Sequence, residues 1–195
     1  MTRATHSLPP EYFTELYASN PDPWGFTTSA YEQAKYEATL AALGRPRYPE
    51  ALEVGCSIGV LTRRLAERCE ALLALDVAEN ALTAARARCA DSPHVDFLRA
   101  AVPAEWPPGR FDLVVISEVL YFFTPGDLAA LAAHLAAALK PGAEVVLVHW
   151  LGETNYPLSA DEAVETLIGL TRDRLAPAHQ SRTERYRLDV LRAPA

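Results

Sequence analysis

Short apolar segments alternate with helix-like patterns through the middle of the chain. The apolar segments are four to seven residues long, and between them apolar residues recur every three or four positions. This alternation predicts βαβ units, and hence an α/β fold with a doubly wound, mostly parallel sheet and helices on both faces. The five predicted strands are residues 51–54, 71–75, 95–98, 111–116 and 143–149.

The helical pattern is strongest between the fourth and fifth predicted strands. Asp127 is the expected N-cap of this helix, and residues 140–142 (Lys-Pro-Gly) are expected to end it. Two earlier helices are expected over residues 60–71 and 81–89. The apolar face of the longest helix carries Leu128, Leu131, Leu135 and Leu139.

The end of the chain has a different pattern, with one more helix followed by alternating polar and apolar residues. Residues 182–191 alternate as a strand does, and residues 175–181 are expected to be their hairpin partner, although Pro177 is unfavourable in a paired strand. An antiparallel hairpin added to a parallel sheet distinguishes this chain from a nicotinamide-binding domain.

A length of 195 residues fits a single domain, 1–195. Hydrophobic residues make up 50% and charged residues 22%, as in a packed globular protein. Within the domain we expect a helical cap or lid at 1–45, a ligand-binding core at 46–150, and a helix with a C-terminal hairpin at 151–195.

Charge and cysteine content exclude several classes of partner. The formal net charge is −7, with 25 acidic against 18 basic residues, which disfavours a nucleic-acid partner. The three cysteines include no Cys-x-x-Cys spacing, so neither a disulfide framework nor a metal site is predicted. No apolar run approaches the roughly 20 residues of a membrane helix, and the N-terminus lacks a signal-peptide pattern. We therefore expect a cytoplasmic protein without a membrane partner.

A glycine-rich loop follows the first predicted strand, in the sequence LEVGCSIG of residues 52–59. Glycines there let the backbone approach a ligand and open a helix whose first N–H groups are free, although a tight turn alone would also require them. Glu53 would repel a pyrophosphate but suits an amino group. Asp76, at the end of the second strand, can accept hydrogen bonds from both ribose hydroxyls or can cap a helix.

These blocks, together with FDLVVISEVLYF and LKPGAEVVLVHW, resemble the class I S-adenosylmethionine-dependent methyltransferases over residues 51–150. The resemblance implies a seven-stranded sheet ending in an antiparallel hairpin, with S-adenosylmethionine as cofactor and S-adenosylhomocysteine as its product. Within this class, DPWGFTTSAYEQAKYEATLAAL, CSIGVLT and HWLGETNYPLSADE resemble nodulation protein S and its relatives, N-methyltransferases of deacetylated chitin oligosaccharides. The chain departs from the usual pattern at Ser57 (commonly glycine), Ala101 (commonly an acid) and Val164 (a histidine in nodulation-type proteins).

The resemblance implies a set of cofactor-binding residues. Backbone groups of Ala101 and Val102 would contact the adenine, and the segment with Trp24 and Tyr31 would form a lid or merely an amphipathic cover of the sheet. Lysine occurs only at 35 and 140, which suggests that a compact ammonium is needed at position 35, near a carboxylate. The full expected set is Trp24, Tyr31, Lys35, Glu53, Gly55, Cys56, Ser57, Gly59, Asp76, Val77, Ala101, Val102 and Ser117.

The implied reaction is in-line displacement of a methyl group from a sulfonium, for which an amine acceptor must be neutral. Glu118 is the first candidate to hold the acceptor's proton, although its carboxylate could instead orient the cofactor or cap a turn. His149 is the second candidate, or else a buried histidine bonded to the backbone. Tyr121, Phe122 and Trp150 are expected to contact the acceptor, Tyr121 also within the catalytic group, unless they belong to the core.

We therefore expect methyl transfer to the amine nitrogen of a small or medium polar acceptor, such as an amino sugar or oligosaccharide. The alternatives are an O-methyltransferase of a small metabolite and a non-catalytic protein that binds the cofactor. A dehydrogenase is disfavoured because GCSIGV lacks the second glycine of G-x-G-x-x-G. A nucleic-acid amine methyltransferase is disfavoured because residues 117–120 read Ser-Glu-Val-Leu rather than Asn/Asp-Pro-Pro-aromatic. Both a monomer and a homodimer remain open.

Overall fold

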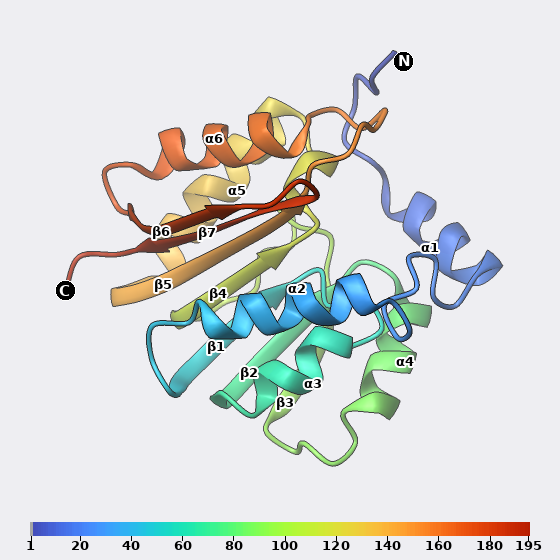
Figure 1. Cartoon of the computed structure of the whole chain (residues 1–195), viewed down its shortest axis with the longest axis horizontal. Helices are drawn as coiled ribbons and strands as arrows, with labels where there is room; N and C mark the ends of the chain where they lie inside the picture. The colour runs from blue at the N-terminus through green and yellow to red at the C-terminus, as the bar shows by residue number, and fades with distance from the viewer. Residues whose placement is uncertain (1) are drawn as a thin grey trace.

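One seven-stranded sheet forms the centre of the computed structural model, which describes residues 2–195 (Figure 1). The strand order is β3-β2-β1-β4-β5-β7-β6, with β1 to β5 parallel and β7 antiparallel to both of its neighbours. The strands are β1 (Tyr48–Val54), β2 (Cys69–Asp76), β3 (Val95–Arg99), β4 (Phe111–Ser117), β5 (Leu139–Trp150), β6 (Ala176–Arg182) and β7 (Tyr186–Arg192). This confirms the predicted doubly wound sheet with a C-terminal hairpin.

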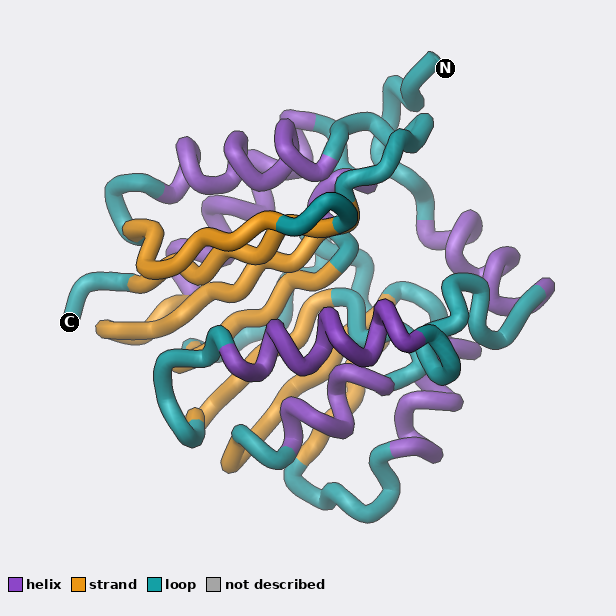
Figure 2. The backbone as a smooth tube through the Cα atoms, in the orientation of Figure 1, coloured by secondary structure: helices purple, strands orange, loops and turns teal. Residues whose placement is uncertain are grey.

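Helices cover both faces of the sheet (Figure 2). Helices α2, α3 and α4 pack on one face and α5 and α6 on the other, while α1 lies beyond the carboxyl ends of the strands, beside α4 (Figure 1). The helices are α1 (Pro10–Ser19), α2 (Ala30–Ala41), α3 (Val60–Ala66), α4 (Glu79–Arg88), α5 (Pro125–Ala138) and α6 (Ala160–Thr171), with a short 3-10 helix at Leu120–Phe122.

The central strands read as continuous apolar runs because both of their faces are covered. In β4, Val114 and Ile116 belong to the cluster with α5 and α6, whereas Leu113 and Val115 belong to the cluster with α2 and α3. Leu128, Leu131 and Leu135 line one face of α5 and are buried against this sheet, as predicted. Leu139, predicted to continue that face, is instead the first residue of β5.

Three predicted helix boundaries were wrong. Helix α5 is capped by Thr124, whose hydroxyl accepts the backbone N–H of Asp127 at 3.3 Å, so Asp127 lies in the first turn instead, where a carboxylate complements the helix dipole. Residues 140–142 belong to β5 rather than to a helix stop, since the helix already ends at Ala138. The helix expected over 60–71 ends at Ala66 because β2 begins at Cys69.

Strand β6 forms one edge of the sheet, and every one of its seven residues is exposed. Pro177 is tolerated there because an edge strand has one row of groups outside the ladder, and the register shifts between Pro177 and His179. None of the helices in residues 2–195 combines the length and apolar character needed to cross a bilayer.

Candidate active site

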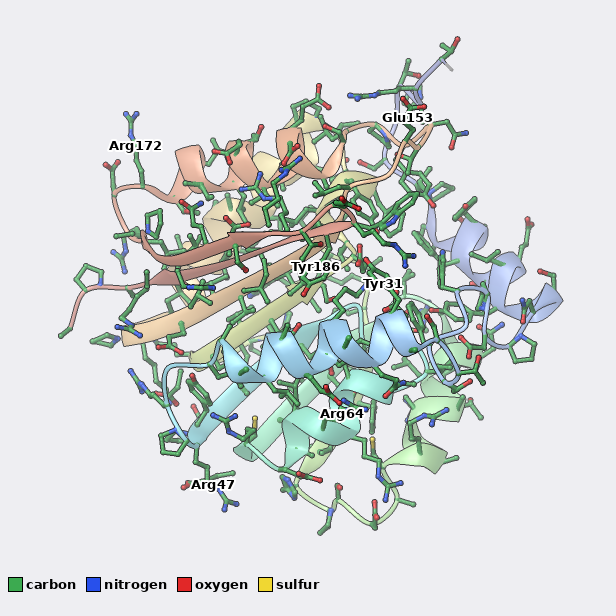
Figure 3. All side chains as sticks on the ribbon, viewed as in Figure 1. Tyr31, Arg47, Arg64, Glu153, Arg172 and Tyr186 are labelled. Carbon is green, nitrogen blue, oxygen red and sulfur yellow. The ribbon has the colours of Figure 1, made fainter. Side chains whose placement is uncertain are left out.

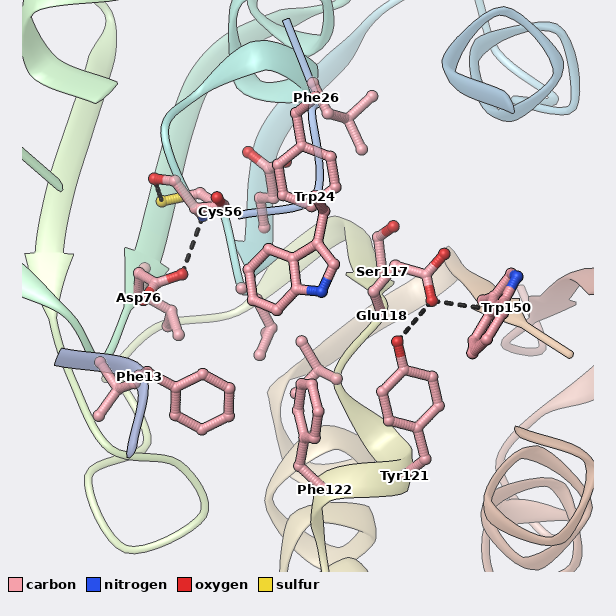
Figure 4. A pocket seen from close by; sticks show the side chains of 18 of the residues that line it. Phe13, Trp24, Phe26, Cys56, Asp76, Ser117, Glu118, Tyr121, Phe122 and Trp150 are labelled. Carbon is pink, nitrogen blue, oxygen red and sulfur yellow. Dashed lines mark hydrogen bonds between the residues drawn. The ribbon is translucent and has the colours of Figure 1, made fainter. Parts of the chain in front are cut away.

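A cavity of about 530 Å³ lies at the carboxyl ends of β1, β2 and β4, at the point where the winding of the sheet reverses (Figure 4). In the view of Figure 4, Asp76 and Glu118 lie on opposite sides of Trp24. Two of the expected site residues, Gly59 and His149, do not line the cavity. The expected residues that line it are Trp24, Tyr31, Lys35, Glu53, Gly55, Cys56, Ser57, Asp76, Val77, Ala101, Val102, Ser117, Glu118, Tyr121, Phe122 and Trp150.

Two glycines of the first loop serve different purposes. Gly55 has φ +82°, and a Cβ there would lie 2.3 Å from Cγ2 of Val119, so the absence of a side chain keeps the loop close to the end of β4. Gly59 has φ +78°, and its Cβ would lie 2.9 Å from the Cα of Ala85 in α4. Gly59 therefore allows α3 and α4 to pack closely, and it does not line the cavity.

Asp76 is not the N-cap of the helix that follows it, because α4 has Ala78 at that position and no side-chain capping hydrogen bond. Its carboxylate accepts the backbone N–H of Ser57 at 2.8 Å and that of Ala78 at 2.9 Å, which ties the first loop to the end of β2. The side chain is 8% exposed and lines the cavity, and burial raises its pKa. Each carboxylate oxygen has a second lone pair, so Asp76 can still accept hydrogen bonds from a ribose.

Glu53 is the more unusual carboxylate, because it is 2% exposed at the edge of the cavity. Its Oε2 has no hydrogen-bond partner within residues 2–195, and burial raises its pKa to about 7. A buried carboxylate oxygen without a partner is costly, and a bound amino group would satisfy it. With Asp76 on the neighbouring strand, Glu53 fits a ligand that carries both a ribose and an ammonium, as S-adenosylmethionine does.

Glu118 organises the opposite end of the cavity. It follows β4 with φ +60°, and its Oε1 lies 2.5 Å from Nζ of Lys35. Its Oε2 accepts the hydroxyl of Tyr121 at 2.7 Å and the backbone N–H of Trp150 at 2.8 Å (Figure 4). Burial alone would raise the pKa of Glu118, but the Lys35 ammonium holds it below its usual value. Both oxygens of this carboxylate are therefore occupied.

The first turns of α2 reach both the core and the cavity. Tyr36 packs into the core against the sheet, and Tyr31, Lys35 and Tyr36 all line the cavity. Lys35 Nζ lies 5.2 Å from the ring centre of Tyr31 and between the carboxylates of Glu118 and Glu32, 3.1 Å from Oε1 of the latter. The expected carboxylate beside Lys35 is thus confirmed, and there are two.

His149 has a structural environment rather than a place at the cavity. Its ring is fully buried, and Nε2 accepts the backbone N–H of Leu120 at 3.1 Å. Burial lowers the pKa of His149 to about 4, so the ring is neutral at pH 7. It packs edge-on against Tyr121, with ring centres 5.5 Å apart. His149 therefore supports the short helix that carries Tyr121, as in the second interpretation given above.

Sequence reasoning missed several residues that line the cavity. Tyr17 of α1 shares a hydrogen bond with the hydroxyl of Ser57, the position where a third glycine is usual. Tyr156 stacks on Tyr121 with ring centres 5.4 Å apart, and the guanidinium of Arg185 lies 3.6 Å from the ring centre of Tyr31. The three-residue spacing of Glu32 and Lys35 was a usable signal, because such residues face each other on a helix.

No metal arrangement accompanies these groups: within residues 2–195, no three His, Cys, Asp or Glu side chains come together as metal ligands would. The three cysteines are free and buried.

Comparison with known proteins agrees with this geometry. The family model for nodulation protein S matches residues 14–177. Nodulation protein S of Bradyrhizobium diazoefficiens is 31% identical over 157 residues, which cover 80% of this chain and 75% of that one. The protein of the same name from Sinorhizobium fredii is 36% identical over 129 residues, 64% of this chain and 59% of that one. The chain thus spans less than two thirds of the length of some curated relatives.

Two solved structures share the fold. The N-methyltransferase NodS of Bradyrhizobium japonicum, in complex with S-adenosylhomocysteine, superposes with a TM-score of 0.81 at 22% identity, covering 95% of this chain and 99% of that one. A protein of Pseudomonas syringae assigned as a methyltransferase superposes with a TM-score of 0.74 at 35% identity, covering 84% of this chain and 99% of that one. The chain therefore belongs to the nodulation protein S family of class I S-adenosylmethionine-dependent methyltransferases.

Proposed function

We propose that this protein transfers the methyl group of S-adenosylmethionine to an amine nitrogen of a small or medium polar acceptor, with an amino sugar or amino oligosaccharide as the favoured class. The observation that carries the proposal is the pair of carboxylates, Glu53 and Asp76, at the ends of neighbouring strands around a loop that Gly55 keeps free of a side chain. The B. japonicum relative is an N-methyltransferase and was solved with S-adenosylhomocysteine, which supports the same choice.

Each end of the cavity would take a different part of the reaction. When bound, S-adenosylmethionine supplies an activated methyl group on a sulfonium. Asp76 would accept hydrogen bonds from the ribose hydroxyls, and Glu53 would face the amino group. Ala101 and Val102 would lie along the adenine, since both line the cavity beyond the end of β3.

The N-terminal segment 1–45 would act as the lid of this site. Tyr17 and Phe13 of α1 line the cavity. Trp24 and Phe26 lie against each other at a tilt of 31°, with ring centres 5.4 Å apart, and both line the cavity. Together they would exclude water from the methyl group during transfer. The hydrogen bond between Tyr17 and Ser57 would connect the lid directly to the first loop.

Tyr121 and Trp150 would form the walls around the acceptor, with Glu118 as the residue that positions them. Glu118 was the first candidate for the proton acceptor, but its oxygens are held by Lys35, Tyr121 and Trp150. A carboxylate with those contacts and a lowered pKa is a poor proton acceptor. We assign it the fixing of the acceptor walls instead. His149 would act only by supporting Tyr121.

The cytoplasm is the proposed place of action, without a nucleic-acid or membrane partner. The three buried free thiols suit a reducing compartment, and a net charge of −7 does not suit a phosphate backbone.

Calorimetric titration with S-adenosylhomocysteine, with NAD as the control ligand, tests the first half of the proposal. Binding of S-adenosylhomocysteine alone is expected, and binding of NAD alone would overturn it. Methyl transfer is then assayed with glucosamine oligosaccharides and with their N-acetylated forms, which keep the hydroxyls but block the amine. Methylation of the free amines alone is expected, whereas equal methylation of both would establish the alternative, an O-methyltransferase.

A further inference from the structure

The end of the cavity around Lys35 holds a second buried carboxylate, that of Glu32. Glu32 lies in the first turn of α2, is 7% exposed, and lines the cavity. Its Oε1 accepts a hydrogen bond from Lys35 Nζ at 3.1 Å. Its Oε2 lies 2.9 Å from the same nitrogen but off the direction of a hydrogen bond, and it has no hydrogen-bond partner among residues 2–195.

Glu32 and Glu118 lie on either side of the same ammonium, yet they differ in what they can accept. Glu118 has both oxygens engaged by three hydrogen-bond donors. In the part of the chain that the structure describes, Glu32 has Lys35 as its only donor: Oε1 accepts a hydrogen bond from it, and Oε2 is close to the same ammonium but accepts no hydrogen bond. Burial raises the pKa of Glu32, and the negative charge of Glu118 raises it further. The positive charges of Lys35 and, more weakly, Arg185 act in the opposite direction, but the pKa remains above its usual value. A carboxylate whose pKa lies above its usual value is a more effective base at pH 7.

The side chain next to Glu32 also lacks a partner. The hydroxyl of Tyr31 is buried and makes no hydrogen bond within the described chain. Its ring is held in place by the guanidinium of Arg185, and by Tyr186, whose ring centre is 6.1 Å away (Figure 3). One helical turn thus carries a carboxylate oxygen and a hydroxyl that accept or donate no hydrogen bond among the described residues, on two residues that line the same cavity. Buried polar groups of this kind point to a polar ligand that completes them.

We propose that Glu32 is the proton acceptor for the methylated amine and that Tyr31 binds a polar group next to that amine. The inference rests on the proposed function and narrows its acceptor to a primary ammonium beside a hydroxyl or similar group, as in a 2-amino sugar. In the reaction, an ammonium N–H gives its proton to Glu32. The freed nitrogen lone pair forms the N–C bond as the C–S bond breaks, and the electrons of that bond remain on sulfur. Glu32 then releases its proton to solvent.

The test compares wild type with Glu32→Gln and with Glu37→Gln, a control on the same helix whose side chain is 74% exposed. For each, kcat is measured against pH with a glucosamine oligosaccharide, and S-adenosylhomocysteine binding is measured by calorimetry. Glu32→Gln is expected to lower kcat by about 100-fold or more. Its kcat should rise about tenfold per pH unit towards the pKa of the free amine, because solvent must then take the proton. Binding of S-adenosylhomocysteine should stay at the wild-type value, and Glu37→Gln should match wild type throughout.

A second measurement needs no variant and covers the case in which Glu32→Gln fails to fold. Wild-type kcat is measured against pH with acceptor amines of different pKa values. If Glu32 takes the proton, the acid limb keeps the same midpoint for all of them, and a midpoint that follows each amine would overturn the assignment. Tyr31→Phe is expected to raise KM about fivefold to tenfold while keeping the acid limb.

The two hypotheses fail in different ways. If wild type binds S-adenosylhomocysteine but methylates no amine, the proposed function is wrong, and the role of Glu32 is rejected with it. If wild type methylates amines and Glu32→Gln keeps its kcat and its pH profile, only the role of Glu32 is rejected.

Discussion

Replacing Glu118 by glutamine removes the charge around which the acceptor end of the cavity is built. The carboxylate accepts from three donors: the ammonium of Lys35, the hydroxyl of Tyr121 and the backbone N–H of Trp150. Glutamine has nearly the same shape, but its NH₂ group is itself a donor. Whichever way the amide turns, its NH₂ group faces at least one of the three donors. The negative charge of Glu118 that compensates the Lys35 ammonium is also lost.

The size of the effect follows from these contacts. Removing one partner of a buried ion pair costs about 3–5 kcal/mol, because the other charge is left without compensation. Lys35 is 2% exposed, but Glu118 retains 17% exposure, which admits some water. Glu32 also remains beside Lys35. We therefore expect Glu118→Gln to lower the free energy of unfolding by roughly 2–4 kcal/mol. Glu37→Gln, which affects only an exposed pair with Arg64, should cost less than about 0.5 kcal/mol.

Urea denaturation of both variants at pH 7 measures the difference. A cost of Glu118→Gln equal to that of Glu37→Gln would refute the argument. The pH dependence provides a second check. Since the folded pKa of Glu118 lies below its unfolded value, its contribution is present above about pH 4.3 and is lost as the pH falls through the folded pKa. The gap between wild type and Glu118→Gln should therefore narrow as the pH is lowered from 5 to 3.

Four further predictions concern other parts of the molecule. Asp76→Ala is expected to lose about 1.5–3 kcal/mol of S-adenosylhomocysteine affinity, and unchanged binding in calorimetry would reject the ribose assignment. Gly59→Ala, whose Cβ would lie 2.9 Å from the neighbouring helix at φ +78°, should destabilise the fold by about 1–3 kcal/mol. Gly169→Ala, with nothing within 4 Å in α6, should stabilise it by about 0.5–1 kcal/mol in the same denaturation assay. Burial raises the pKa of Glu53 to about 7, so its contribution to stability is lost as the pH rises from 4.5 to 7. Burial lowers the pKa of His149 to about 4, so its contribution to stability is lost as the pH falls from 6.5 to 4. The two pH dependences of stability oppose each other in wild type. As the pH is lowered from 6.5 to 4.5, Glu53→Gln should therefore lose stability more steeply than wild type, and parallel stability profiles would contradict this.

The sheet was predictable because its central strands are buried on both faces and read as plain apolar runs. The ends of the helices and strands were harder to predict from the sequence. Thr124 and Asp127 are both good capping residues three positions apart, and only the geometry of the chain before α5 decides between them. Lys140 was read as a helix end, yet it lies in β5, where its ammonium pairs with Glu50 and Asp112.

The place of Glu53 and Asp76 in the cavity was also predictable, because both residues lie at or near the carboxyl ends of predicted strands. The acceptor end was not, because Glu32 and Arg185 come from α2 and the C-terminal hairpin, whose approach depends on tertiary packing. His149 could have been placed from its strand: it has the same parity as Val145 and Leu147, which belong to the cluster with α5 and α6. That parity predicts a side chain directed into this layer rather than towards the ligand.

The exposed outer strand β6 has a consequence for how the protein survives when its structure fluctuates. With no buried side chain, β6 is held by its ladder to β7 and by surface contacts such as Arg182 with Asp161, so it is the strand expected to fray first. Loss of β6 would expose β7, which has five buried residues, as an edge strand able to pair with a strand of another molecule. Pro177 and the shifted register interrupt the outermost row of hydrogen-bonding groups, which discourages a second chain from docking there to begin fibril growth. Strand β6, which is expected to detach most easily, is therefore also the strand that protects the sheet from aggregation.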